Sequence, residues 1–127
     1  MAQARLEHTN ITVSDPKRTA AWLTEVFGWH IRWQGASLNN GYSVHVGNAD
    51  SYLALYTPKA PVAEAHPRYG NAAGLNHVGI VVEDLDAVEA RVRAEGIETF
   101  NHADYEPGRR FYFDGPDSVE YEMVSYG

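Results

Sequence analysis

In the first half of the chain, hydrophobic residues first alternate with polar ones and then recur at the spacing of a helix. Residues 6–13 alternate between two faces, and His8 and Asn10 share one of them, which is typical of a β-strand. Asp15 precedes a proline and suits the N-cap of a helix whose apolar residues recur at helical spacing until Gly28. Three more strands are predicted, over residues 29–33, 42–46 and 52–56, which gives the order β-α-β-β-β.

The second half of the chain repeats this order of elements. A strand is predicted over residues 75–82, and Asp84 caps a helix that ends at Gly96. A third element begins as a strand at residues 97–100 and continues into a loop over residues 101–108. Two more strands are predicted, over residues 109–113 and 119–126.

The two opening strands are similar in sequence as well as in pattern. Residues 6–15 read LEHTNITVSD and residues 75–84 read LNHVGIVVED, so five of ten positions coincide at a constant offset of 69. This match aligns His8 with His77. A linker with three of the six prolines, residues 57–74, separates the repeats. We therefore predict a single domain, residues 1–127, made of module one (residues 5–57), the linker and module two (residues 75–126).

Composition removes several classes of function. The chain has no cysteine, which excludes disulfides, thiolate zinc sites and a cysteine nucleophile. Its net charge is −7, and residues 75–127 carry twelve acidic but only four basic side chains, which disfavours binding to nucleic acid. No stretch approaches the roughly 20 apolar residues of a membrane span, and the N-terminal residues lack the apolar core of a signal peptide. We expect a cytoplasmic protein that binds neither nucleic acid nor membranes.

Two β-α-β-β-β modules with these openings resemble the vicinal oxygen chelate superfamily, which includes glyoxalases, bleomycin-resistance proteins and extradiol dioxygenases. The closing segment FYFDGPDSVEYE, residues 111–122, adds to the resemblance. The resemblance implies an α+β fold in which the two modules form a curved mixed-sheet half-barrel around a central cleft. It also implies a homodimer, in which the modules close within one chain or are exchanged between chains.

The resemblance further implies a divalent metal ion held by His8, His77 and Glu122. Glu120 is an alternative carboxylate, because it lies two residues away on the same face of the strand. The corresponding position in module one is Leu53 or Ala54, neither of which can ligate a metal. Two histidines and one carboxylate with open positions suit Fe(II), and also Mn(II), Ni(II), Co(II) or Zn(II).

Four further residues are candidates for contact with a substrate. Tyr112 is a candidate catalytic residue, because its phenol could donate a hydrogen bond to a metal-bound oxyanion, although strand tyrosines often serve packing alone. Arg109 or Arg110 could hold an anionic group, although paired arginines at a strand start are commonly solvated. Asn10 shares the face of His8 and is a candidate for substrate contact or for support of the ligand.

Two functions are consistent with these features. The first is a metal-dependent enzyme that chelates two adjacent oxygens of a small substrate, either a dioxygenase or a lyase or isomerase of the glyoxalase kind. The second is a binding protein without a catalytic metal that sequesters a cationic small molecule, as bleomycin-resistance proteins do, and the acidity of the chain suits it. The intact set of His8, His77 and Glu122 favours the enzyme.

Overall fold

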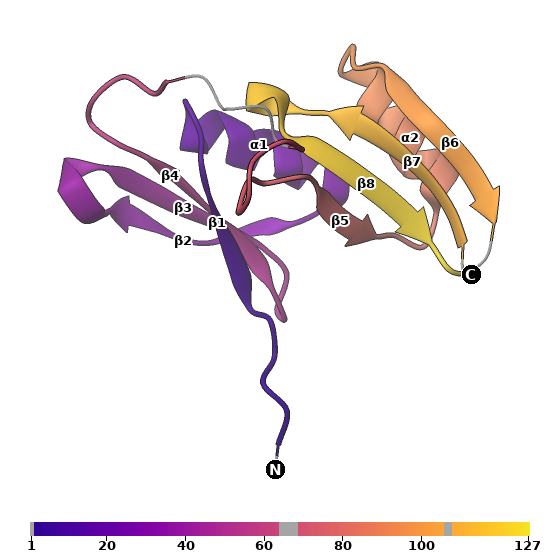
Figure 1. The fold of residues 1–127 in the computed structure, drawn as a ribbon, viewed down its shortest axis with the longest axis horizontal. Coiled ribbons are helices and arrows are strands. Elements are labelled where there is room, and N and C mark those ends of the chain that lie inside the picture. Colours follow the sequence, from indigo (N-terminus) through magenta and orange to yellow (C-terminus); the bar gives the residue numbers. More distant parts are fainter. Residues whose placement is uncertain (1, 64–68, 106–107) are drawn as a thin grey trace. The chain divides into compact units, whose positions relative to one another are not determined.

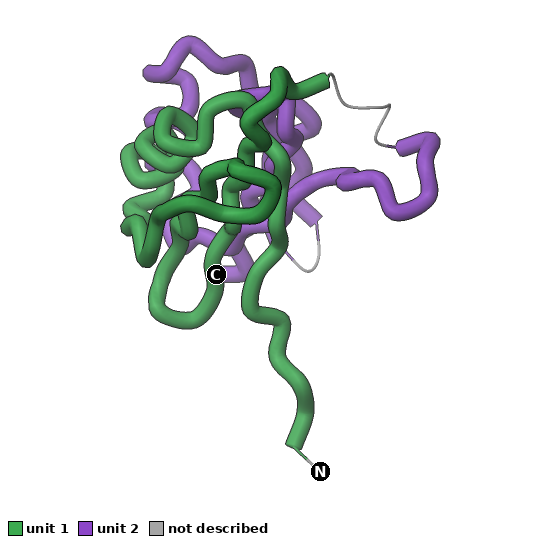
Figure 2. The backbone as a smooth tube through the Cα atoms, turned by 90° about the vertical axis from the view of Figure 1, so that its left-hand side faces the viewer, with its two compact units in different colours: residues 1–63 green, residues 64–127 purple. Residues whose placement is uncertain are grey.

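The computed structural model describes residues 2–63, 69–105 and 108–127. The chain divides into two compact units, unit 1 (residues 1–63) and unit 2 (residues 64–127), which Figure 2 shows in separate colours. Residues 64–68 of the predicted linker and residues 106–107 of the predicted loop lie outside the described residues. None of the helices in the described parts is long and apolar enough to cross a membrane.

Unit 1 contains one helix and four strands in the predicted order. They are β1 (His8–Thr12), α1 (Pro16–Phe27), β2 (His30–Ala36), β3 (Tyr42–Gly47) and β4 (Tyr52–Thr57), with a short 3-10 turn at Leu38–Asn40. The strand order across the sheet is β1-β4-β3-β2, and only the β1–β4 pair is parallel. Asp15 caps α1 by accepting a hydrogen bond from the backbone N–H of Arg18, and Gly28 ends it in the left-handed conformation, as predicted.

Unit 2 has the same topology (Figure 1). Its elements are β5 (Val78–Val81), α2 (Leu85–Ala94), β6 (Thr99–Tyr105), β7 (Gly108–Asp114) and β8 (Glu120–Ser125), with a 3-10 turn at Pro116–Ser118. The strand order is β5-β8-β7-β6, again with only the first pair parallel. The prediction of two β-α-β-β-β modules is therefore confirmed.

The predicted loop over residues 101–108 is wrong, because β6 continues to Tyr105 and pairs with β7. A one-residue bulge between Phe100 and Ala103 explains the irregular pattern that favoured a loop. Asn101 occupies the left-handed region there, with φ of 53°. The extra residue interrupts the alternation of faces, so the sequence no longer shows the period of a strand.

Each sheet buries one face against its own helix. In unit 1 the buried face is aliphatic, and in unit 2 it carries the rings of Phe111, Phe113 and Tyr121. Side chains at the intervening positions, including Glu122 and Tyr112, project from the opposite face because successive residues of a strand alternate. Glu122 and Tyr112 therefore stand on the face away from the helix.

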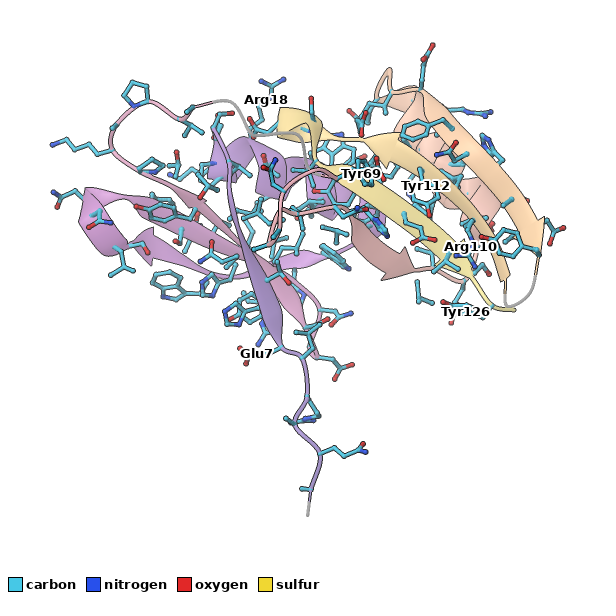
Figure 3. All side chains as sticks on the ribbon, viewed as in Figure 1. Glu7, Arg18, Tyr69, Arg110, Tyr112 and Tyr126 are labelled. Carbon is cyan, nitrogen blue, oxygen red and sulfur yellow. The ribbon has the colours of Figure 1, made fainter. Side chains whose placement is uncertain are left out.

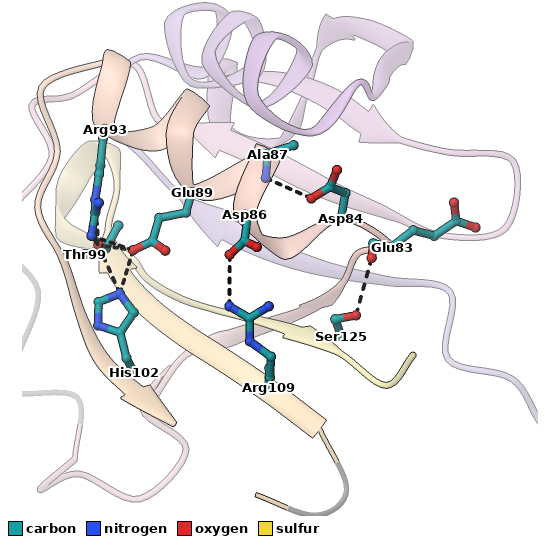
Figure 4. Close-up of polar contacts among 10 residues, drawn as sticks. All are labelled: Glu83, Asp84, Asp86, Ala87, Glu89, Arg93, Thr99, His102, Arg109 and Ser125. Atoms are coloured by element: carbon teal, nitrogen blue, oxygen red, sulfur yellow. Dashed lines mark hydrogen bonds and ion pairs between the residues drawn. The ribbon is translucent and has the colours of Figure 1, made fainter. Parts of the chain in front are cut away.

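The bulge in β6 also ties this strand to α2 (Figure 4). Glu89 on the helix accepts hydrogen bonds from Thr99 Oγ1 at 2.5 Å and from His102 Nε2 at 2.6 Å, and forms an ion pair with Arg93 at 2.9 Å. The imidazole of His102 also stacks on Phe111, which places it on the helix side of the sheet. Burial disfavours the ionised form of Glu89, but the hydrogen bonds from His102 and Thr99 outweigh this and lower its pKa below 4.5.

We expect this network to make the stability of the protein pH-dependent. A lowered pKa in the folded state contributes stability above the usual pKa of 4.5, and this contribution is lost as the pH falls through the folded-state value. Urea unfolding at about pH 6 and about pH 3 should show that Glu89→Gln removes roughly 1–2 kcal/mol of the difference between the two pH values. Asp86→Asn removes an exposed ion pair with Arg109 and should change it little. An unchanged pH dependence in Glu89→Gln would contradict the assignment.

Candidate metal centre

The centre of the candidate site in unit 2 is the pair His77 and Glu122. His77 directly precedes β5 and Glu122 lies in β8, the strand that pairs with β5 in parallel. The His77 Nε2 and Glu122 Oε1 atoms are 3.0 Å apart, and the glutamate side chain is only 13% exposed. The parallel pairing of two distant segments thus brings together an imidazole and a carboxylate that are 45 residues apart.

The other ring nitrogen of His77 is held by its neighbour. His77 Nδ1 lies 2.6 Å from Oδ1 of Asn76, and Nε2 lies 3.0 Å from Oε1 of Glu122, so an oxygen faces each ring nitrogen. A proton or a metal ion between Nε2 and the carboxylate would hold this pair together.

His8 in unit 1 has the same local arrangement. Its Nδ1 lies 2.8 Å from Oε1 of Glu7, the residue that precedes it, as Asn76 precedes His77. The contact with His8 lowers the pKa of Glu7, which keeps this carboxylate ionised. Hydrogen bonds of this kind fix the tautomer of metal-binding histidines and leave Nε2 for the ion. In both histidines Nδ1 is thus in contact with a side-chain oxygen of the preceding residue.

Glu122 has two further partners, both on β7. Arg110 donates a hydrogen bond from Nη1 to Glu122 Oε2 at 2.7 Å, and Tyr112 is the register partner of Glu122 in the β7–β8 pair. Figure 3 labels both β7 side chains. Burial and the contact with Glu122 raise the pKa of Tyr112, so its phenol retains its proton. The Nε atom of Arg110 is buried and lacks a hydrogen-bond partner among the described residues.

Arg109 points to the opposite side of the sheet from Arg110. It forms an ion pair with Asp86 of α2 at 2.9 Å, and this contact lowers the pKa of Asp86. Adjacent residues of a strand face opposite sides, so only one of the two arginines can accompany Glu122. The structure brings Arg110, but not Arg109, to His77 and Glu122.

Glu120 is engaged elsewhere. Its side chain is buried at 7% exposure, and Oε2 accepts a short hydrogen bond of 2.5 Å from the hydroxyl of Tyr69. In unit 2, the carboxylate beside His77 is that of Glu122.

The equivalent positions in unit 1 follow from the strand register. Asn10 of β1 pairs with Ala54, as its repeat equivalent Gly79 pairs with Glu122. Module one therefore has Ala54, and not Leu53, at the position of the carboxylate. His45 pairs with Ala54 as Tyr112 pairs with Glu122. Asn10 lies on β1 two residues beyond His8 and is exposed.

Two supporting residues, Glu7 and Asn76, were missed by the sequence analysis. Each provides a side-chain oxygen directly before a repeated histidine. The repeat aligns Glu7 with Asn76, and both side chains carry an oxygen that can accept a hydrogen bond. A comparison that counts only identical residues does not find this pair, because the two residues differ.

The donor set of unit 2 fits a divalent metal ion. Two neighbouring ligands, each about 2.1 Å from one ion and at right angles, are separated by about 3.0 Å. His77 Nε2 and Glu122 Oε1 are 3.0 Å apart, so the pair matches this geometry without movement. No group of three histidine or carboxylate side chains able to hold one ion is found within the residues that the structure describes.

A paired β-α-β-β-β architecture with a histidine at each opening strand and a glutamate on the final strand defines a class of small-molecule enzymes and binding proteins. The Glyoxalase/Bleomycin resistance protein/Dioxygenase superfamily matches residues 5–123. The chain belongs to this superfamily. Among curated proteins, none matches the chain.

Solved structures share the fold at low sequence identity. A glyoxylase/bleomycin resistance protein/dioxygenase domain from Frankia sp. EAN1pec is 19% identical, with a TM-score of 0.84 over 99% of this chain and 100% of that one. The genomically encoded fosfomycin resistance protein FosX from Listeria monocytogenes, complexed with Mn(II) and a sulfate ion, is 16% identical, with a TM-score of 0.70 over 98% and 93% of the two chains. TnmS3, an antibiotic binding protein from Streptomyces sp. CB03234, is 17% identical, with a TM-score of 0.74 over 100% and 99%.

Proposed function

We propose that the protein is a divalent-metal-dependent enzyme that binds a small substrate through two adjacent oxygens at a site formed by His8, His77 and Glu122. The reaction is of the dioxygenase or the lyase or isomerase type. The observation that carries this proposal is the 3.0 Å separation of His77 Nε2 and Glu122 Oε1, with the other nitrogen of His77 already engaged. Iron, manganese, nickel, cobalt or zinc would each suit these ligands.

The residues around the pair have distinct tasks in this proposal. Glu7 and Asn76 orient the two imidazoles, and a bound metal supplies Lewis acidity that stabilises negative charge on the substrate oxygens. The ring of Tyr112 lies 5.7 Å from the ring of His77, centre to centre, and its raised pKa keeps the phenol protonated, so that it can donate a hydrogen bond to a substrate oxygen. We propose that the guanidinium of Arg110, which lies beside Glu122, contacts an anionic group of the substrate.

Asn10 and Arg109 are the two remaining candidates for contact with the substrate. Asn10 shares the face of His8, and we propose it as a contact for the substrate. Arg109 is paired with Asp86 on the helix side of the sheet, so in this proposal the anion contact falls to Arg110. We also propose a cytoplasmic homodimer, in which His8 joins His77 and Glu122 either within one chain or from a second copy.

The alternative is a binding protein that sequesters a cationic small molecule without a metal. The net charge of −7 favours it, as does the structural likeness to TnmS3, an antibiotic binding protein. A sequestering protein does not need an imidazole in contact with a carboxylate that is only 13% exposed. The metal-dependent enzyme therefore accounts for more of the site.

Metal content decides between the two functions. The protein is purified without an affinity tag or chelator, and its metals are measured by mass spectrometry before and after anaerobic incubation with Fe(II), Mn(II), Ni(II) and Zn(II). We expect close to one bound ion per chain. The identity of that ion then selects the assays, with iron pointing to oxygen-dependent reactions and the others to lyase or isomerase reactions. If no metal binds under any condition, the sequestering function replaces the enzyme.

We expect His8→Ala to weaken metal binding by more than about tenfold, the lower end of what is lost when only a supporting hydrogen bond of a ligand is removed. Titration of the metal-free protein with Mn(II), followed by calorimetry, measures the change. His30→Ala is a matched control, because His30 is an exposed histidine of β2, which lies at the opposite edge of the same sheet from β1. Equal affinities for the His8→Ala variant and the unchanged protein would remove His8 from the ligand set.

A further inference from the structure

The two carboxylate oxygens of Glu122 face different partners. Oε1 lies 3.0 Å from His77 Nε2, and Oε2 accepts a hydrogen bond of 2.7 Å from Arg110 Nη1. Both side chains of the ion pair are largely buried, Glu122 at 13% exposure and Arg110 at 15%. Solvent ions therefore screen the pair weakly, and a charge-assisted hydrogen bond of this kind is among the strong ones. One oxygen of Glu122 thus faces the imidazole, whereas the other is held by the guanidinium.

The strand register explains why Arg110 reaches this carboxylate. Tyr112 pairs directly with Glu122, and Arg110 lies two residues before Tyr112, on the same face of β7. Arg110 is therefore a diagonal neighbour of Glu122, at a separation that a long side chain can span. On the other side, Arg110 pairs with Ala103 of β6. The methyl group of Ala103 cannot accept a hydrogen bond, so this neighbour does not compete with Glu122 for the guanidinium.

Tyr105 at the end of β6 also holds the guanidinium. The Cζ atom of Arg110 lies 4.9 Å from the centre of the Tyr105 ring, which is a cation–π contact. A planar guanidinium can stack on an aromatic ring and still donate hydrogen bonds from its edge, so Arg110 can contact Tyr105 and Glu122 together. Tyr105 thus limits the positions that Arg110 can adopt. Because Tyr105 is 59% exposed, it can be replaced with little effect on the interior of unit 2.

The number of oxygens that a carboxylate offers distinguishes one metal ion from another. Ca(II) takes about six to eight oxygen ligands and often binds both oxygens of one carboxylate. Zn(II) takes about four ligands, and one carboxylate oxygen beside an imidazole nitrogen suits it. An ion that binds both oxygens of Glu122 must displace Arg110 from Oε2, whereas an ion that binds Oε1 alone need not. The hydrogen bond from Arg110 therefore opposes the first kind of ion and not the second.

We propose that Arg110 determines metal selectivity, because it holds Oε2 of Glu122 and so favours a small ion bound through Oε1 over Ca(II). This role rests on the proposed metal-binding function, and it assigns the choice of ion to a residue outside the ligand set. Tyr105 is a positioning residue that acts through Arg110. Losing a hydrogen bond to a charged group costs a factor of about 10 to 100 in affinity. Arg110 therefore disfavours Ca(II) relative to Zn(II) by about this factor.

The test measures the affinity for Ca(II) relative to that for Zn(II). Each ion is titrated into the Mn(II)-loaded protein, and the electron paramagnetic resonance signal of released Mn(II) reports its binding. We expect Arg110→Met to raise the Ca(II)-to-Zn(II) affinity ratio by about 10- to 100-fold. The ratio is compared because the loss of a positive charge strengthens the binding of both ions. Arg109→Met is the matched control, since it removes the same charge from the adjacent side chain, which is paired with Asp86. It should change the ratio by less than about threefold.

Variants of Tyr105 test the same role without removing the buried ion pair. Tyr105→Ala should raise the ratio by about two- to fivefold, and Tyr105→Phe, which keeps the ring, should leave it unchanged. A merely structural role for Arg110 predicts weaker binding of both ions and no rise in the ratio.

Circular dichroism shows whether Arg110→Met is folded. If the unchanged protein binds Mn(II) but folded Arg110→Met leaves the ratio unchanged, the selectivity role is overturned and the metal-binding function stands. If Arg110→Met is unfolded, an unchanged ratio in Tyr105→Ala overturns the role in the same way. An unchanged protein that binds no Mn(II) removes the metal-binding function and the selectivity role together.

Discussion

Replacing Glu122 with glutamine is expected to lower the affinity for a divalent metal ion by at least about 100-fold. The amide is neutral, and it can turn an N–H₂ group toward His77 where the carboxylate presents an oxygen at 3.0 Å. The loss should exceed the roughly 10- to 100-fold cost of removing a supporting residue, because Glu122 is itself a proposed ligand. Titration of the metal-free variant with Mn(II) measures the affinity.

Glu120→Gln is the matched control, since it makes the same change two residues away on the same strand. We expect its metal affinity to stay within about threefold of the unchanged protein, because Glu120 is held by Tyr69. Glu122→Gln also leaves the 15%-exposed side chain of Arg110 without its ion pair, so circular dichroism must show that the variant is folded. A large loss in Glu120→Gln together with little change in Glu122→Gln would transfer the ligand role to Glu120.

The sequence repeat predicted the order of elements in each module, because residues 6–15 and 75–84 align at a fixed offset. The pairing of His77 with Glu122 was implied by the family resemblance, since the repeat alone does not say which strands pair. In the structure, His77 Nε2 and Glu122 Oε1 lie 3.0 Å apart. The choice between Leu53 and Ala54 stayed open, because a shift of one residue in a hairpin is invisible in the sequence and only the observed register decides it.

Features that depend on local backbone irregularity could not be predicted in this way. The bulge after Phe100 adds one residue to β6, and this single insertion made a strand read as a loop. The sequence also could not choose between Arg109 and Arg110, because the two residues are adjacent and chemically alike. The face that each occupies depends on the register of β7, so the sequence offered both as anion contacts and the structure separates them.

Replacing Phe113 with alanine is expected to lower the free energy of unfolding by about 3–5 kcal/mol. Phe113 is fully buried, and its ring stacks on Tyr121 at 5.2 Å and an angle of 18°. The substitution leaves a cavity beneath the two strands that carry Tyr112 and Glu122. Since domains of this kind are stable by only about 5–15 kcal/mol, the loss is a large share of the total. Urea unfolding of the metal-free protein measures it.

Tyr126→Ala is the control for Phe113→Ala, because it also truncates an aromatic ring of unit 2 but one that is 58% exposed. Its cost should stay below about 1 kcal/mol. Equal costs for the two variants would mean that the interior of unit 2 is not packed as the structure has it. Tyr121 directly precedes Glu122 and points to the opposite face, so the packing of Tyr121 on Phe113 fixes the strand that presents the carboxylate to His77. The Phe113→Ala variant should therefore also bind Mn(II) more weakly than Tyr126→Ala, which would connect core packing directly to the geometry of the metal centre.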